Sequence, residues 1–532
     1  MDEFQLYIIL FTLAVILYAW FFTTTRIVSS KGRNIRTLPP SPPALPVIGN
    51  LHQLGRFPHR SLFLLSKSYG PAMYLKFGSK PVLVVSSAAL AKEILKTHDI
   101  AFAGRADLST AKKIFYDLKD LIYSQYGEEW RKLRSLFVHG LLGGSRVKSF
   151  NSIREDEISI LVEKINKKCI SSSSREAVSN FHSPATVNLT EMFGTLANNL
   201  ISRAAFGKKH GEKHGGKLLC VIDRAVGLLS NLTVGEFVPW IGWINRLIGH
   251  DAALDECAKE IDEILDLIIE DHLRDGIGAG GEDDDNNNKE NFMDILLGKY
   301  KGDVPGASTS IDILSVKGII ADVFGAGTDT SSATLVWVMT ELIRHPQVMK
   351  KLQHEVREIT KGKPHIGEED LQKMSYLKAV IKETFRIHPT VAIYLHAARE
   401  YVNLMGYDIE PETIVLINAW AIGRDSSSWH DPGNFMPERF LNSSVDYRGT
   451  YFELIPFGAG RRICPGLEFA AANIEHTVAN LVRNFDFALP GGAKSEDLDA
   501  SERPGITIGK KEPLIVVPRL FECSRGSVMS QE

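Results

Sequence analysis

The stretch 456-PFGAGRRICPG-466 decides how the rest of the chain is interpreted. Its glycines permit two interpretations, a loop that cradles phosphate or a turn that presents Cys464 to a metal. Phosphate loops follow the patterns GxGxxG or GxxxxGK[ST] after a strand. Here the glycines stand at 458, 460 and 466, and no lysine or hydroxyl residue occupies the required place. The spacing therefore excludes a nucleotide site and favours Cys464 as a metal ligand.

The neighbours of Cys464 favour a reactive thiolate. Pro465 follows it directly and predicts a helix over 465–483, because proline is favoured at the first helical position. The N-terminus of a helix stabilises a thiolate, and Arg462 adds positive charge. A single thiolate without a partner cysteine or histidine is not a zinc site, whereas a haem iron needs only one protein ligand on its proximal side. An inert buried cysteine is the general alternative.

This loop resembles the haem-binding loop of the cytochrome P-450 family of haem-thiolate monooxygenases. It carries the pattern FxxGxRxCxG at Phe457, Gly460, Arg462, Cys464 and Gly466. The resemblance covers nearly the whole chain and is closest to the plant microsomal A-type group of specialised (secondary) metabolism. It implies one large cytochrome P-450 fold domain that is mainly α with a small β-sheet. It also implies heme b with Cys464 as the axial iron ligand, and Gly460 and Gly466 close to the flat cofactor.

A second motif, 326-AGTDTS-331, lies inside a long apolar helix predicted over 315–344. Glycines at 325 and 327 each cost about 1 kcal/mol relative to alanine, so they indicate either a ligand against the helix or close helix packing. A buried acid, Asp329, beside the Thr330 hydroxyl suits a proton relay. The family resemblance implies the same roles, with Thr330 in an oxygen-binding kink and Asp329 in proton delivery.

An ion-pair cluster is expected behind the cysteine loop. Glu383 and Arg386 in 382-KETFRIHP-389 are three residues apart on one helical face of an apolar segment. An isolated pair of this kind is usually a surface ion pair of little energetic value. The resemblance implies that Arg439 of 437-PERF-440 completes a buried, structural Glu-Arg-Arg cluster.

Cationic and indole donors are expected at the edge of the cofactor. Trp130 and Arg134 in 130-WRKLR-134 are one turn apart, which is also typical of an ordinary amphipathic helix. The resemblance implies that both donate to the haem propionates together with Arg462.

The sequence departs from the family pattern in 390-TVAIYLHAARE-400. The arginine that relatives direct at a propionate would stand at Ala397. Its possible substitutes are His396 and Arg399. The resemblance implies that the substrate cavity is lined by the segment 390–394, the loop 105–125, the residues before Ala326 on the long helix and the segment 501–507.

The N-terminus predicts a membrane anchor. Residues 4–22 form an uncharged apolar run, about 28 Å long as a helix at ~1.5 Å per residue, and basic residues follow it. A cleaved signal peptide is the alternative, but a basic n-region and a cleavage site are missing. We expect a single-pass protein of the endoplasmic reticulum membrane with a cytosolic catalytic domain. The expected parts are 1–25 (transmembrane anchor), 26–50 (basic, proline-rich hinge), 51–522 (haem-binding catalytic domain) and 523–532 (disordered tail).

Charge and cysteine usage exclude other classes. The net charge of −3 gives no polycation for nucleic acid. The five cysteines are scattered without CxxC pairs, which disfavours a disulfide framework or a structural zinc site. Further helices are predicted over 255–273 and 370–387, strands over 82–85 and 413–418, and a solvated loop over 276–291.

Three functions remain open. The first is a monooxygenase that takes electrons from NADPH-cytochrome P-450 reductase and uses O2 to hydroxylate, desaturate or cyclise an apolar terpenoid, alkaloid or coumarin. The second is a haem-dependent isomerase or dehydratase of the same fold that needs no reductase. The third is a non-catalytic membrane haem protein. The pair Asp329–Thr330 favours the first, because an acid next to a hydroxyl suits proton delivery during O–O cleavage.

Overall fold

A computed structural model describes residues 36–176, 185–230, 234–275, 290–301 and 311–521. The expected anchor, most of the predicted loop 276–291 and the expected tail lie outside these ranges. Among the described residues, no helix combines the length and the apolar character that crossing a bilayer requires.

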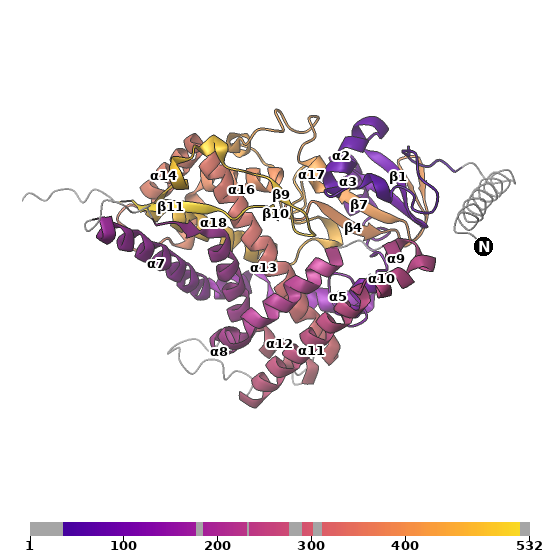
Figure 1. The fold of residues 1–532 in the computed structure, drawn as a ribbon, viewed down its shortest axis with the longest axis horizontal. Coiled ribbons are helices and arrows are strands. Elements are labelled where there is room, and N and C mark those ends of the chain that lie inside the picture. Colours follow the sequence, from indigo (N-terminus) through magenta and orange to yellow (C-terminus); the bar gives the residue numbers. More distant parts are fainter. Residues whose placement is uncertain (1–35, 177–184, 231–233, 276–289, 302–310, 522–532) are drawn as a thin grey trace, which may run out of the picture.

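Helices make up the larger part of the molecule (Figure 1). The long ones are α7 (Asn151–Glu176), α8 (Leu189–Ser230), α11 (His250–Asp275), α13 (Ile313–Arg344), α14 (Pro346–Ile359), α16 (Ser375–Ile387) and α18 (Leu467–Asn484). The shorter ones are α2 (Pro58–Tyr69), α3 (Ala88–Lys92), α4 (Ser109–Ile114), α5 (Glu128–Ser135), α6 (Gly144–Ser149), α9 (Val234–Phe237), α10 (Trp243–Leu247), α12 (Phe292–Lys301), α15 (Glu368–Lys373) and α17 (Ala419–Ile422). The helices predicted over 255–273, 315–344 and 370–387 are confirmed, the last as α15 and α16.

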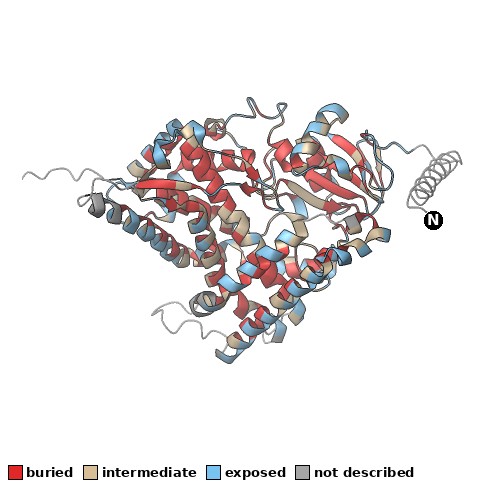
Figure 2. Ribbon diagram, viewed as in Figure 1, coloured by how far each residue is buried: buried red, intermediate tan, exposed pale blue. Residues whose placement is uncertain are grey.

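Helix α13 runs through the centre of the helical part and is buried over most of its length (Figure 2). It begins after Asp312, whose side chain accepts a hydrogen bond from the N–H of Ser315 at 2.7 Å. It ends at Arg344 because Pro346 cannot continue the same helix. Helix α8, which packs against α13, consists of two helical segments joined at Gly207, where φ is 75°.

The main sheet lies at one end of the molecule and has the strand order β1-β2-β7-β4 (Figure 1). Its strands are β1 (Ala72–Phe77), β2 (Lys80–Val85), β4 (Ile393–Ala397) and β7 (Ile414–Asn418). The central strands β2 and β7 are parallel, with Val82 opposite Ile414, and both match the predicted strands. The small sheets contain β3 (Val187–Asn188), β5 (Val402–Leu404), β6 (Tyr407–Ile409), β8 (Phe485–Ala488), β9 (Glu502–Arg503), β10 (Gly509–Lys510) and β11 (Ile515–Leu520). The predicted fold class, mainly α with a small β-sheet, is confirmed.

The proline-rich segment packs along the edge of the main sheet. The N–H of Tyr74 donates to the carbonyl of Pro40 at 2.9 Å, and the N–H of Asn50 donates to that of Lys76 at 2.6 Å. Each proline removes a backbone donor and fixes φ, so the stiff segment follows β1 with only a few hydrogen bonds.

Candidate active site

The cysteine loop is held by backbone contacts that only glycine permits. The N–H of Cys464 donates to the carbonyl of Phe457 at 2.9 Å and closes the loop. Gly460 has a φ of +67°, and a Cβ there would lie 2.2 Å from the carbonyl oxygen of Leu95. The loop can therefore lie directly against the helical turn Glu93–Thr97.

Helix α18 begins at Leu467, two residues after the predicted start, with Gly466 as its N-cap. Pro465 thus lies outside the helix, and its fixed φ shapes the approach to the cap. The N–H of Gly466 and the charge of Arg134 both lower the pKa of the Cys464 thiol, but burial raises it further than they lower it. The helix N-terminus and Arg134 therefore do not outweigh burial, and the predicted thiolate at Cys464 stays a prediction. A metal cation at the sulfur would supply the missing stabilisation.

Two surfaces inside the fold are open where a flat cofactor would lie. Cys464 keeps an accessible surface although burial dominates its pKa. Ala326 is exposed in the middle of α13, whereas Phe324 and Thr328 beside it are buried. A Cβ at Gly466 would meet only the Cys464 sulfur, at 3.8 Å. The residues present therefore fit a flat group that is bound by a thiolate and faces α13.

A cluster of donors lies beside this loop. The Arg462 guanidinium donates to the carbonyls of Ala103 at 3.0 Å, Leu121 at 3.3 Å and Ser124 at 2.7 Å. Burial, followed by the repulsion of neighbouring arginines, lowers the pKa of Arg462 to about 8. Trp130 lies 4.4 Å from the Arg462 guanidinium, measured to its ring centroid, and its Nε1 donates to Leu121 at 3.1 Å.

Arg134 is the free donor of this cluster. It forms neither a hydrogen bond nor an ion pair with any residue that the structure describes, and burial lowers its pKa. Crowded, partly desolvated cations of this kind favour binding of an anion. The structure thus brings Trp130, Arg134 and Arg462 together, but the single N–H of Trp130 is already donated to Leu121. Arg134 and the remaining N–H groups of Arg462 are the donors that fit carboxylates such as haem propionates.

At the position where relatives carry an arginine, Ala397 is buried in β4, and its N–H donates to the carbonyl of Gly104 at 3.0 Å. His396 is buried, and its Nδ1 is 3.0 Å from the carbonyl oxygen of Phe102. Burial and the charge of Arg105 lower the pKa of His396 to about 3, so its ring is neutral at pH 7. His396 therefore supplies no positive charge here.

Arg399 and Arg105 are the two remaining cations. Arg399 donates to the carbonyl of Ile100 at 3.2 Å, and its guanidinium lies 4.9 Å from the ring centroid of Tyr126. Arg105 is buried and donates to the carbonyls of Ile122 and Leu395. The sequence reasoning missed Arg105. It comes to this place because Gly104 pairs with Ala397, far away in the sequence.

Thr330 and Asp329 occupy one turn of α13 with different surroundings. The Thr330 hydroxyl donates to the carbonyl of Ala326 at 2.7 Å, and α13 continues through this turn as one helix. The Asp329 side chain is 27% exposed, and its carboxylate is 3.8 Å from Arg503. The expectation of a buried Asp329 is therefore wrong, because the partly exposed Arg503 of β9 covers it only in part.

The glycines of the same turn serve helix packing. A Cβ at Gly325 would lie 3.1 Å from Cγ2 of Ile222, and a Cβ at Gly327 would lie 2.8 Å from Cδ1 of Ile201. Both isoleucines belong to α8. Of the two explanations for these glycines, close helix packing is the one the structure supports, whereas the surface left open on α13 is that of Ala326.

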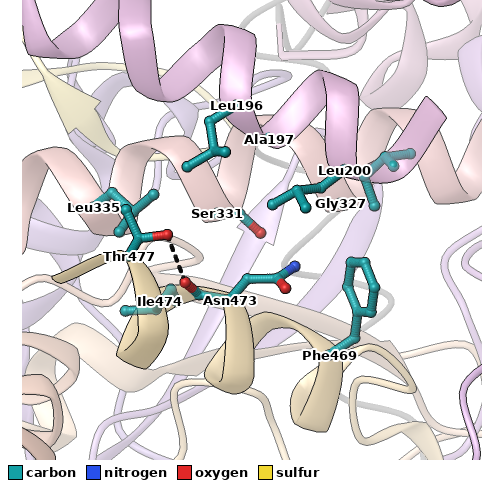
Figure 3. A pocket seen from close by; sticks show the side chains of 11 residues that line it. Leu196, Ala197, Leu200, Gly327, Ser331, Leu335, Phe469, Asn473, Ile474 and Thr477 are labelled. Atoms are coloured by element: carbon teal, nitrogen blue, oxygen red, sulfur yellow. Dashed lines mark hydrogen bonds between the residues drawn. The ribbon is translucent and has the colours of Figure 1, made fainter. Parts of the chain in front are cut away.

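A separate small cavity lies between α8, α13 and α18 (Figure 3). It has room for only about 10 Å³ of water-sized occupancy, far below the range of about 300–1,000 Å³ usual for ligand pockets. On α13 the cavity is lined by Gly327 and Ser331. These two residues directly follow Ala326 and Thr330 in the sequence. Its lining comprises Leu196, Ala197, Leu200, Ile201, Gly327, Ser331, Leu335, Phe469, Asn473, Ile474 and Thr477.

The expected ion-pair cluster is present. Glu383 and Arg386 are fully buried, with 2.7 Å between Oε2 and Nε, and Arg439 Nε is 3.0 Å from Glu383 Oε1. Arg386 also donates to the carbonyl of Gly423 at 2.7 Å. The cluster thereby fixes the segment 423–439 against α16. Phe385 of α16 in turn packs against Phe457, with ring centroids 5.2 Å apart.

Comparison with known proteins gives a consistent result. Residues 39–517 match the family described as Cytochrome P450. The chain is 48% identical to norfluorocurarine oxidase of Strychnos sp, over 90% of this chain and 92% of that protein. It is 46% identical to tabersonine/lochnericine 19-hydroxylase of Catharanthus roseus, over 91% of this chain and 92% of that protein. A solved structure of a zebra fish cytochrome P450 with abiraterone aligns with a TM-score of 0.70 and 26% identity, covering 87% of this chain and all of that one.

Proposed function

This chain belongs to the cytochrome P450 family, and we propose that it oxidises an apolar plant metabolite such as a terpenoid, an alkaloid or a coumarin. As a member of the family it is a haem-thiolate oxidoreductase of the monooxygenase type. It uses O2, a small substrate and a redox partner. For this partner we propose NADPH-cytochrome P-450 reductase, and for the outcome hydroxylation, desaturation or ring closure.

The partly exposed Cys464 of the loop 456–466 carries this proposal. Bound haem supplies an iron centre that activates O2. Cys464 would hold the iron, and Arg134 and Arg462 would hold the propionates through their N–H groups, while Trp130 supports Arg462 by ring contact. Arg105 takes the place of the arginine missing at Ala397.

The remaining loop residues have supporting roles in this proposal. Phe457 ties the loop to α16, Gly460 lets it approach Leu95, and Gly466 leaves space beside the sulfur. The cluster of Glu383, Arg386 and Arg439 would keep α16, and with it Phe457, in place.

Asp329 and Thr330 are assigned to proton delivery. Asp329 is partly exposed, so its carboxylate can exchange protons with water. The neighbouring Thr330 hydroxyl would relay a proton by giving up its own, which now bonds the carbonyl of Ala326, and taking up another at Oγ1.

A membrane location is supported by an exposed apolar patch. Its residues are Trp240, Trp243, Leu247 and Ile248, and their exposed fractions lie between 59% and 75%. Together with Leu45 and Val47 at the sheet edge, which are also exposed, they lie at the end of the molecule that holds β1 (Figure 1). Patches of this kind mark membrane or protein contacts, and tryptophan favours the bilayer interface. We propose that this patch rests on the endoplasmic reticulum membrane beside a 1–25 anchor and a 26–50 hinge.

The test combines binding with turnover. A panel of apolar plant metabolites is screened for a shift of the haem spin state, and the responding compounds are incubated with NADPH, with and without the reductase. We expect an oxygenated, desaturated or cyclised product only when both electron donors are present. Equal turnover without NADPH or reductase would instead establish an isomerase or dehydratase.

A further inference from the structure

Two aspartates meet in the interior where the loop 116–124 contacts α13. Asp120 is 0% exposed and Asp322 is 4% exposed. Each has one oxygen, Oδ1, that is buried without a hydrogen-bond partner among the described residues. The two carboxyls lie side by side, because Oδ2 of Asp120 and Oδ2 of Asp322 accept from the same N–H, that of Ile122, at 3.1 and 3.3 Å. Two ionised carboxylates only accept hydrogen bonds, so a proton between them supplies the donor that the pair lacks.

The other carboxylate oxygens bind the backbone of the loop. Asp322 Oδ2 accepts from the N–H of Leu121 at 2.7 Å and of Ile122 at 3.3 Å. Asp120 Oδ2 accepts from the N–H of Tyr123 at 2.8 Å and also from that of Ile122. The backbone N–H groups of residues 121–123 are thus hydrogen-bonded to the carboxyl pair, and Asp322 links them to α13.

The backbone carbonyls of the same loop accept hydrogen bonds from the arginines of the proposed cofactor site. Leu121 and Ser124 accept from Arg462, and Ile122 accepts from Arg105 Nε at 2.7 Å. The loop therefore lies between a carboxyl pair on one side and two arginines on the other. Any movement of the loop would displace Arg462 and Arg105.

We propose that Asp120 and Asp322 share one proton and act as a positioning pair, which fixes the loop 116–124 between α13 and the arginines of the cofactor site. The consequence for the cofactor rests on the proposed function, whereas the shared proton does not.

The electrostatic surroundings support a single shared proton. Burial raises the pKa of Asp120 to about 6, and burial together with the charge of Asp120 raises that of Asp322 well above its usual range. Arg105 and Arg462 face Asp120 and favour one negative charge, while the nearby Tyr123 is neutral at pH 7. The pair therefore keeps one charge and one proton.

The loop needs such a clamp because its backbone is strained. Tyr116, Asp117 and Leu118 have φ values of 49°, 56° and 63°, in the left-handed region that non-glycine residues avoid. A Cβ at Gly318 of α13 would lie 3.0 Å from the carbonyl oxygen of Lys119. The loop is thus held directly against the helix in a conformation it would otherwise leave.

The sign of the pH dependence follows from the raised pKa values. Above pH ~4 the native pair binds more protons than the unfolded chain. The pair holds two protons below about pH 6, one shared proton between that pH and the higher pKa of Asp322, and none above it. The clamp is therefore lost as the pH rises through the pKa of Asp322.

Asp322→Asn is the decisive variant. The asparagine amide can donate to Asp120 while its oxygen still accepts from Leu121 and Ile122, so every hydrogen bond is kept and the proton is removed. In the full, haem-loaded chain, infrared spectra should show a protonated-carboxyl C=O band that Asp322→Asn lacks. In hydrogen exchange, wild-type amides 121–123 should lose protection as the pH rises, after correction for intrinsic exchange, and those of the variant should not.

Two further variants make the test specific. Asp370→Asn removes a buried carboxylate whose pKa is lowered by Lys363. It should keep both the protonated-carboxyl band and the loss of amide protection with rising pH, which is called the pH step below. Asp120→Asn should keep the band but move the step to lower pH, because the charge that repels ionisation of Asp322 is gone. A band and a pH step that persist in Asp322→Asn, or that are missing from the wild type, would overturn the proposal. None of these outcomes depends on product formation, so they remain informative if the proposed function fails.

Discussion

The Thr330 hydroxyl and the Asp329 carboxylate lie on the same turn of α13, but only Asp329 is paired with a cation, Arg503. Thr330→Ala removes the hydroxyl nearest the open helix surface and leaves Asp329 unchanged. Because positioned proton donors contribute on the order of 10²-fold or more to rate, we expect product formed per NADPH consumed to fall severalfold to 10²-fold, with the remainder released as peroxide.

A matched control for this variant exists on the same helix. The buried Thr340 hydroxyl makes the same kind of bond, to the carbonyl of Val336 at 2.7 Å. Thr340→Ala should leave the ratio of product to NADPH unchanged. Equal ratios in both variants would remove Thr330 from the relay.

The buried cluster around Glu383 makes a prediction about stability. Glu383→Gln leaves the Arg386 and Arg439 charges without their buried carboxylate, and breaking a buried pair of this type costs about 3–5 kcal/mol. Glu438→Gln removes a partly exposed partner of Lys351 and should cost no more than about 1 kcal/mol. Denaturant unfolding of both variants measures the difference, and a cost for Glu383→Gln as small as that of Glu438→Gln would contradict this account.

At the residue scale, a feature of the site could be predicted from the sequence when it depends on residues close together in the chain. The chemistry of Cys464 and the pairing of Glu383 with Arg386 follow from residues a few positions apart. The exposure of Asp329 and the place of Arg105 do not, because they depend on β9 and on the bridge between Gly104 and Ala397. Such contacts join segments whose adjacency no local pattern encodes.

At the scale of elements, the packing of α8 on α13 depends on Gly327. Gly327→Ala places a methyl group against Ile201, and overpacking of this kind costs about 1–3 kcal/mol, offset by up to about 1 kcal/mol of helix propensity. Ile201→Val removes the Cδ1 atom that would clash. The double variant should therefore be more stable than Gly327→Ala alone, as measured by thermal unfolding. If Ile201→Val does not restore the stability lost in Gly327→Ala, Gly327 is required for another reason.

The helices α11, α13, α15 and α16 and the strands β2 and β7 could be predicted because hydrophobic periodicity and proline positions are local signals. The start of α18 was two residues off, since proline fits both at the first helical position and just before the cap. The role of the glycines in α13 was undecided because it depends on Ile201 and Ile222 of another helix.

At the scale of the whole molecule, the proposed membrane contact involves the exposed patch 240–248 and the sheet edge. In full chain carrying Trp20→Phe, which removes the tryptophan of the proposed anchor, and bound to vesicles, a quencher placed in the lipid should reduce tryptophan fluorescence. Combined Trp240→Phe and Trp243→Phe should abolish most of this quenching, whereas Trp429→Phe removes a buried tryptophan and should leave the quenched signal intact. Undiminished quenching in the double variant would place the contact elsewhere.

The proposed haem site depends on Cys464, and its most direct test is the absorption spectrum of the reduced protein with carbon monoxide. Wild-type protein should show the band typical of thiolate-bound haem. Cys169→Ala, which removes another buried cysteine, should keep this band, and Cys464→Ala should lose it. Retention of the thiolate band in Cys464→Ala would contradict the assignment of Cys464 as the iron ligand.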